Sequence, residues 1–82
     1  MPGRLAAALR RFASRSVQIE QEILRNPEFR TLCEDYGDAV AALERWRRST
    51  DSIALKRASE YDKLVQELEI EISNYLQTLT DD

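Results

Sequence analysis

Three sets of apolar residues recur at steps of three and four positions along this chain, and no other pattern limits its possible folds so strongly. Such spacing places each set on one face of an α-helix. The sets lie within residues 5–23, 29–43 and 61–79. Since no segment alternates convincingly between apolar and polar residues, the sequence predicts an all-α fold without strands.

Two interruptions divide the pattern into three helices. Proline is unfavourable inside a helix but suits its first position, and Asn26 before Pro27 is a competent N-cap. The Ser-Thr-Asp-Ser cluster at 49–52 is typical of a loop. Because 82 residues leave room for one domain only, we expect a single domain over 1–82 with helices at about 4–25, 27–48 and 52–79.

The short loop predicts that the last two helices pack side by side in opposite directions, as an antiparallel helical hairpin with an additional N-terminal helix. Whether that helix folds back at Asn26 and Pro27 or extends away stays open. A core this small supplies only about 3–5 kcal/mol, and natural proteins of this size add a disulfide, a metal or a partner. One cysteine and no histidine make the first two unavailable. We therefore expect a homodimeric helical bundle without cofactors.

The segment NPEFRTLCEDYGDAVAALERWRRS, followed by a polar turn and YDKLVQELEIEISNYL, resembles the YdcH-like family of small bacterial helical-hairpin proteins. The resemblance covers residues 26–79 and depends on the Asn-Pro-Glu-Phe start, on Leu32, Tyr36 and Leu43, and on a closing helix of acids and aliphatics. It implies a kinked N-terminal helix and an antiparallel hairpin, and no established activity. The longer, arginine-rich N-terminal segment and Gly37 depart from the family pattern.

Catalytic chemistry is not expected from this composition. The chain has no histidine, which is the commonest general base, and its lone thiol, Cys33, is followed by Glu34 and Asp35. Adjacent carboxylates raise the pKa of a thiol, and the position of Cys33 on an apolar stripe favours a buried, unreactive side chain. Gly37 in the second helix costs about 1 kcal/mol relative to alanine. It indicates either a close approach between two helices, which only glycine allows, or a chance substitution whose cost in stability nothing in the structure offsets.

The stripes instead indicate a non-enzymatic scaffold or protein-interaction module that self-associates and binds an unidentified protein partner. Trp46, which three arginines surround, is either a contact residue or a cap on the core. Ile70 lies opposite the main stripe and is either an isolated exposed aliphatic residue or part of a second contact seam. The candidate interface residues are Phe29, Leu32, Tyr36, Val40, Leu43, Trp46, Leu68, Ile70 and Ile72.

An alternative function follows from the uneven distribution of charge. Residues 1–19 contain four arginines and no acid, whereas residues 64–82 contain five acids and no base. Arg4, Arg11 and Arg15 lie on one flank of the first helix and are candidate anion contacts for nucleic acid or an anionic surface. Because the net charge is −3, we do not expect nucleic acid or membrane as the main partner. The unpaired cysteine and the lack of a long apolar segment predict a cytoplasmic protein.

Overall fold

The computed structural model describes residues 3–80, and every regular element in that range is helical. Four α-helices follow one another: α1 (Gly3–Arg11), α2 (Ser16–Arg25), α3 (Pro27–Arg48) and α4 (Ala54–Thr80), with a short 3₁₀ helix, η1 (Ala13–Arg15), between α1 and α2. The prediction of an all-α chain is confirmed for this part of the sequence. Asp81 and Asp82, which belong to the acidic C-terminal segment, lie outside the described residues.

The Asn-Pro junction begins α3 at the residue expected from the sequence. Asn26 is extended, and its side-chain oxygen accepts hydrogen bonds from the backbone N–H groups of Glu28 (3.0 Å) and Phe29 (3.3 Å). These are two of the N–H groups that a helix start leaves without intrahelical partners. Pro27 occupies the first turn, where it needs no N–H donor. The chain therefore changes direction sharply at this point while the Asn26 side chain satisfies two of the N–H groups at the start of α3.

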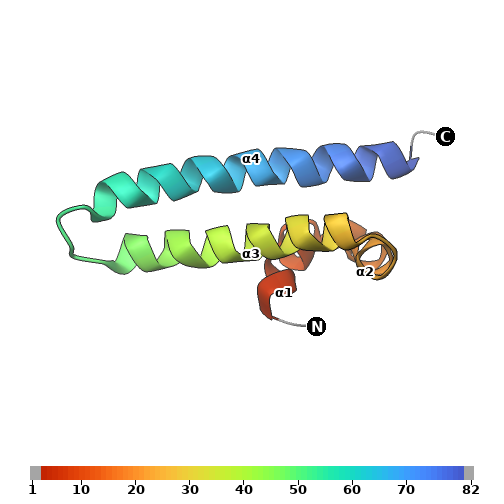
Figure 1. Cartoon of the computed structure of the whole chain (residues 1–82), viewed down its shortest axis with the longest axis horizontal. Helices are drawn as coiled ribbons and strands as arrows, with labels where there is room; N and C mark the ends of the chain where they lie inside the picture. Colours follow the sequence, from red (N-terminus) through yellow and green to blue (C-terminus); the bar gives the residue numbers. More distant parts are fainter. Residues whose placement is uncertain (1–2, 81–82) are drawn as a thin grey trace.

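A polar turn at 49–53 leads from α3 into α4. The Asp51 side chain accepts a hydrogen bond from the backbone N–H of Ile53 (3.2 Å), and its carbonyl accepts one from Ala54 (3.0 Å). Helices α3 and α4 then lie side by side and run in opposite directions (Figure 1). Helix α4 starts two residues later than expected because the Asp51 turn occupies those positions.

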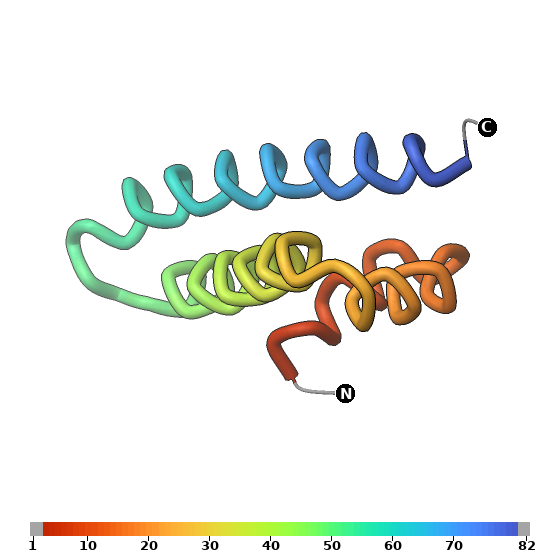
Figure 2. The backbone as a smooth tube through the Cα atoms, turned by 45° about the vertical axis from the view of Figure 1, so that its right-hand side comes forward, coloured from red at the N-terminus to blue at the C-terminus, as the bar shows by residue number. Residues whose placement is uncertain are grey.

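The N-terminal segment corrects the expectation of one helix over residues 4–25. The helix stops at Arg11, the backbone leaves the α region at Phe12 (φ −115°, ψ 49°), and α2 starts at Ser16. The break contains Phe12 and Ser14, which are only moderate helix formers. A straight helix of this length would measure about 33 Å, as long as α3, and because α2 crosses α3 steeply (Figure 1) it would carry Leu5 away from α3. The break returns Leu5 to α3, so that α1 packs against the middle of α3 while α2 lies at the end where α3 begins (Figure 2).

The core lies where α1 and α2 meet the first part of α3 and the last part of α4. Its members are apolar residues that the structure removes almost completely from solvent, and small side chains are frequent among them. The chain folds back at Asn26, which settles the question left open by the sequence. The buried cluster consists of Leu5, Ala7, Ala8, Ile19, Ile23, Phe29, Cys33, Tyr36, Ala39, Leu43, Val65, Ile72 and Leu76.

At Gly37 the backbones of α3 and α1 approach each other closely. A Cβ atom at this position would lie 2.8 Å from the carbonyl carbon of Arg4 and closer still to its oxygen. Both atoms belong to the backbone of α1, which cannot rotate away as a side chain would. Of the two explanations that the sequence left open, the structure supports the close helix–helix approach, and the partner helix is α1.

Replacing Gly37 by alanine tests this contact. Alanine should gain about 1 kcal/mol in helix propensity, but overpacking costs typically about 1–3 kcal/mol, and here a backbone must move. We expect a net decrease in the free energy of unfolding, measured by urea titration with far-ultraviolet circular dichroism. Gly3→Ala is the matched control, because nothing lies within 4 Å of a Cβ at Gly3. A Gly37→Ala protein as stable as the wild type would contradict the close approach.

Candidate interaction surface

Helices α1 and α2 cover only part of the α3–α4 pair. Helix α1 meets α3 around Gly37 and Asp38, and α2 runs directly into the start of α3. From there to the 49–53 turn, α3 and α4 continue without a third helix against them (Figure 1). The molecule is accordingly elongated, with extents of 48 × 24 × 21 Å. A pair of helices cannot enclose a core, so apolar side chains remain accessible along this half.

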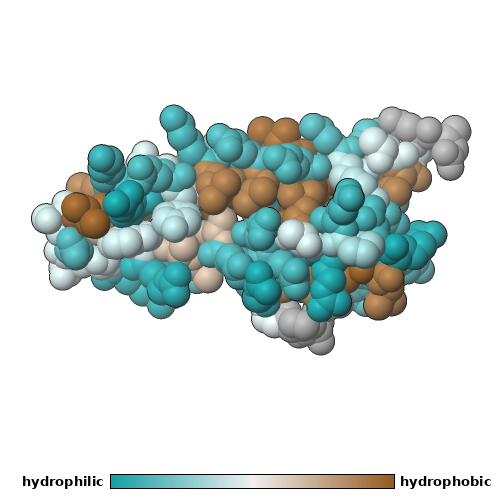
Figure 3. Space-filling model, viewed as in Figure 1, coloured by the Kyte–Doolittle hydropathy of each residue, from teal (hydrophilic) through white to brown (hydrophobic). Residues whose placement is uncertain are grey.

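Two adjoining hollows on the α3–α4 pair define one continuous surface. One is lined by Trp46, Tyr61 and Leu64 with Arg57 and Glu60. The other is lined by Tyr61, Leu64, Leu68 and Ala39 with Asp35 and Asp38. Tyr61 and Leu64 belong to both, so the hollows merge into a strip. Figure 3 shows apolar residues gathered along α4 and in its seam with α3, with hydrophilic residues on both sides. We call Trp46, Tyr61, Leu64 and Leu68 the apolar strip.

The strip carries opposite charges at its two ends. Arg57 and Arg45 lie beside Trp46, near the turn, whereas Asp35 and Asp38 lie beside Leu68. Arg57 is neutralised by Glu60, with Nη1 and Oε1 2.9 Å apart, and Asp38 by Arg4. Within residues 3–80, Arg45 and Asp35 form no ion pair.

The interface residues expected from the sequence separate into two groups. Phe29, Tyr36, Leu43 and Ile72 are buried against the chain's own helices, so no partner can reach them in the folded protein. The other members of the set remain partly or largely accessible. These are Leu32, Val40, Trp46 and Leu68, which are half-buried, and Ile70, which is 60% exposed.

Two residues of the strip were not among the expected contacts. Leu64 and Tyr61 lie with Leu68 and Arg57 at steps of four, three and four along α4, which forms a second face next to the core stripe. Val65 takes the core position and leaves Leu64 39% exposed. The spacing was visible in the sequence, but only the position of α1 and α2 shows that this face stays uncovered. Ile70 lies elsewhere, in a hollow with Phe12 and Arg11.

The three candidate anion contacts are all engaged within the chain. Arg4 donates from Nε and Nη2 to the two carboxylate oxygens of Asp38, at 3.0 and 2.8 Å. These hydrogen bonds lower the pKa of Asp38 and raise that of Arg4. Arg11 lies 3.3 Å from a carboxylate oxygen of Glu69, and Arg15 donates to the carbonyl of Leu76 at 3.0 Å. Binding of nucleic acid or an anionic surface through them stays a prediction, and it would have to compete with these partners.

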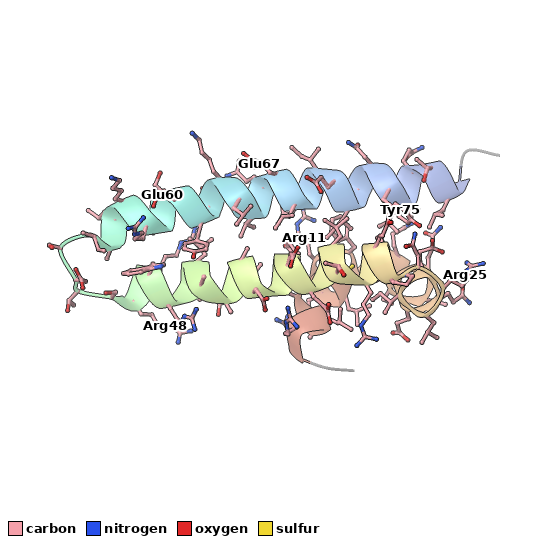
Figure 4. All side chains as sticks on the ribbon, viewed as in Figure 1. Arg11, Arg25, Arg48, Glu60, Glu67 and Tyr75 are labelled. Atoms are coloured by element: carbon pink, nitrogen blue, oxygen red, sulfur yellow. The ribbon has the colours of Figure 1, made fainter. Side chains whose placement is uncertain are left out.

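Two tyrosine hydroxyls donate hydrogen bonds to carboxylates in the part of the molecule that α1 and α2 cover, which we call the covered end: Tyr75 to Glu22 and Tyr36 to Glu69. The hydroxyl of Tyr75 donates to the buried carboxylate of Glu22 and accepts a hydrogen bond from the Asn26 amide (2.7 Å). Figure 4 shows Tyr75 reaching from α4 toward the junction of α2 and α3, with Arg25 at its outer side. The hydrogen bond to Glu22 raises the pKa of Tyr75, and burial, followed by the Glu69 hydrogen bond, raises that of Tyr36. Both hydroxyls therefore stay protonated and serve as donors that tie α4 to the other helices.

Within residues 3–80, no three acidic, histidine or cysteine side chains come close enough to hold a metal ion. In the same part of the chain, none of the helices combines the length and the apolar character that crossing a bilayer requires.

Comparisons with protein-family models, curated proteins and solved structures give no significant match. The resemblance to the YdcH-like family stays a prediction.

Cys33 offers a direct test of the covered end. Its side chain is completely buried, and burial, followed by the nearby Glu34 charge, raises the pKa of its thiol to about 11. Since only the thiolate reacts with disulfide reagents, we expect slow modification at neutral pH in the native protein and fast modification in denaturant. Equal rates in the two states would mean that α1 and α2 do not cover this part of α3.

Proposed function

We propose that this chain is a non-enzymatic protein-interaction module that self-associates through the apolar strip. The observation that carries the proposal is the accessible face formed by Trp46, Tyr61, Leu64 and Leu68 on the half of the hairpin that α1 and α2 leave uncovered. Contiguous apolar surface with a polar rim is characteristic of contact sites. Tryptophan and tyrosine are also enriched among the residues that dominate binding energy.

The size of the strip indicates a reversible association. From Arg57 to Leu68 the contact runs about 16 Å along α4, which corresponds to three helical turns. Stable interfaces bury about 800 Å² on each partner, and two helices over this length supply less. The closed core at the other end gives each copy a fold of its own. We therefore propose a weak homodimer in which two hairpins form a four-helix contact, with α1 and α2 outside it.

The proposal moves the expected interface from the core stripes to their exposed edge. The core residues stabilise the single chain; these are Phe29, Tyr36, Leu43 and Ile72. The apolar strip is the surface that contacts a second chain. The lone buried thiol is consistent with a reducing, cytoplasmic setting, which we also propose.

Leu64→Asp tests self-association at the centre of the strip. Because Leu64 is 39% exposed, the folded chain should tolerate aspartate, whereas a dimer would have to bury its charge. We expect the dissociation constant to rise at least thirtyfold, about 2 kcal/mol. Sedimentation equilibrium over about a hundredfold dilution range measures it, and circular dichroism checks that the helices persist.

Ile70→Asp is the matched control, because Ile70 is an exposed aliphatic residue of the same helix outside the strip. It should leave the dissociation constant unchanged. A wild-type chain that stays monomeric at every concentration would overturn self-association. A dimer lost in Ile70→Asp but kept in Leu64→Asp would place the contact on the other face of α4.

A further inference from the structure

We infer that the second copy docks on the apolar strip in an antiparallel, two-fold arrangement, with Arg45 of each copy opposite Asp35 of the other. This inference rests on the proposed self-association and specifies its geometry. It is carried by the order of charges along the strip.

Two charged residues of this surface that form no ion pair among the described residues, Arg45 and Asp35, lie at opposite ends of the strip. Arg45 shares a hollow with Trp46 at the end near the turn, and Asp35 lines the hollow that contains Leu68. The other charges of the strip have partners within the chain: Arg57 with Glu60, and Asp38 with Arg4. The surface therefore offers one unpaired cation and one unpaired anion, separated by about 15 Å along α3.

Rotational symmetry decides how these charges meet. In a two-fold dimer, any contact between residues i and j occurs twice. If the axis crosses the strip at right angles to the helices, α3 lies against α3 of the second copy in the opposite direction, and both Arg45–Asp35 pairs form. If the axis runs along the helices, the turns of the two copies lie at the same end and α3 of each copy faces α4 of the other, so Arg45 and Asp35 lie at opposite ends of the contact and no Arg45–Asp35 pair forms. Charge complementarity thus selects the antiparallel arrangement.

The apolar residues fit the same axis. On α3, the residue lining the strip nearest the midpoint between Asp35 and Arg45 is Ala39, which is buried. On α4, Tyr61 and Leu64, the two residues common to both hollows, lie at the centre of the strip. Under the antiparallel rotation they face Leu64 and Tyr61 of the second copy. Apolar groups then fill the middle of the contact and charges its ends, which is the usual anatomy of a protein interface.

A charge-reversal experiment tests the arrangement. Asp35→Arg and Arg45→Glu each turn two attractive pairs into two repulsive ones, so each variant alone should dimerise about tenfold more weakly than the wild type. An equimolar mixture restores both pairs, and heterodimers should form with nearly wild-type affinity. Native mass spectrometry separates heterodimers from homodimers, and sedimentation velocity gives the dissociation constants.

Two further charge reversals serve as matched controls. Glu20→Arg and Arg10→Glu change the net charge by the same amounts at exposed positions away from the strip, and neither residue forms an ion pair among the described residues. Both should leave dimerisation within about twofold of the wild type, since distant exposed charges are largely screened.

Cysteine cross-linking gives a second readout that does not depend on affinity. Asp35→Cys mixed with Arg45→Cys should yield a disulfide-linked heterodimer under mild oxidation, whereas Asp35→Cys alone should yield little. Cross-linking of Asp35→Cys to itself would overturn the antiparallel arrangement. So would a wild-type dimer indifferent to both charge reversals, although self-association itself would stand. A monomeric wild type would overturn both proposals.

Discussion

The contact between Gly37 and the backbone of Arg4 determines how the rest of the chain is arranged. Without a side chain at Gly37, α1 lies directly on α3, and the Arg4 guanidinium reaches Asp38 one residue further on. Helix α1 is thereby fixed across the middle of α3. The break at Phe12 then brings α2 back to the Asn26 junction. One half of the hairpin is enclosed as a consequence, and the other half is left as a bare pair of helices.

Polar interactions reinforce this division between the two halves. Glu22, the only buried charged residue among those described, is held by Tyr75, and Phe29 stacks on the same tyrosine with ring centroids 4.6 Å apart. Such a network stabilises a fold only when every member is satisfied, and no buried side-chain polar atom in residues 3–80 lacks a partner. The end of the molecule that α1 and α2 cover is therefore well defined.

The sequence predicts the elements well and their contacts less well. Helical spacing indicates α3 to the residue, since Asn26 and the last-turn arginines act locally, and the position of Cys33 on a stripe indicates its burial. The break at Phe12 could not be predicted from the sequence, because the apolar spacing continues through it and only packing against α3 favours the bend. The exposure of Leu64 could not be predicted for a related reason, because whether its face of α4 is covered depends on where α1 packs. Local rules specify helices, whereas the exposed surface is a property of the whole chain.

Hydrogen exchange at two protein concentrations, below and above the dissociation constant, tests the division into a self-contained end and a pairing surface most directly. Amide exchange reports the stability of each segment separately. Exchange should slow at the higher concentration in residues 39–48 and 57–68, which carry the strip, and stay unchanged in residues 3–25. Identical exchange at both concentrations, or slowing confined to residues 3–25, would contradict the assignment of the strip as the surface through which two copies meet.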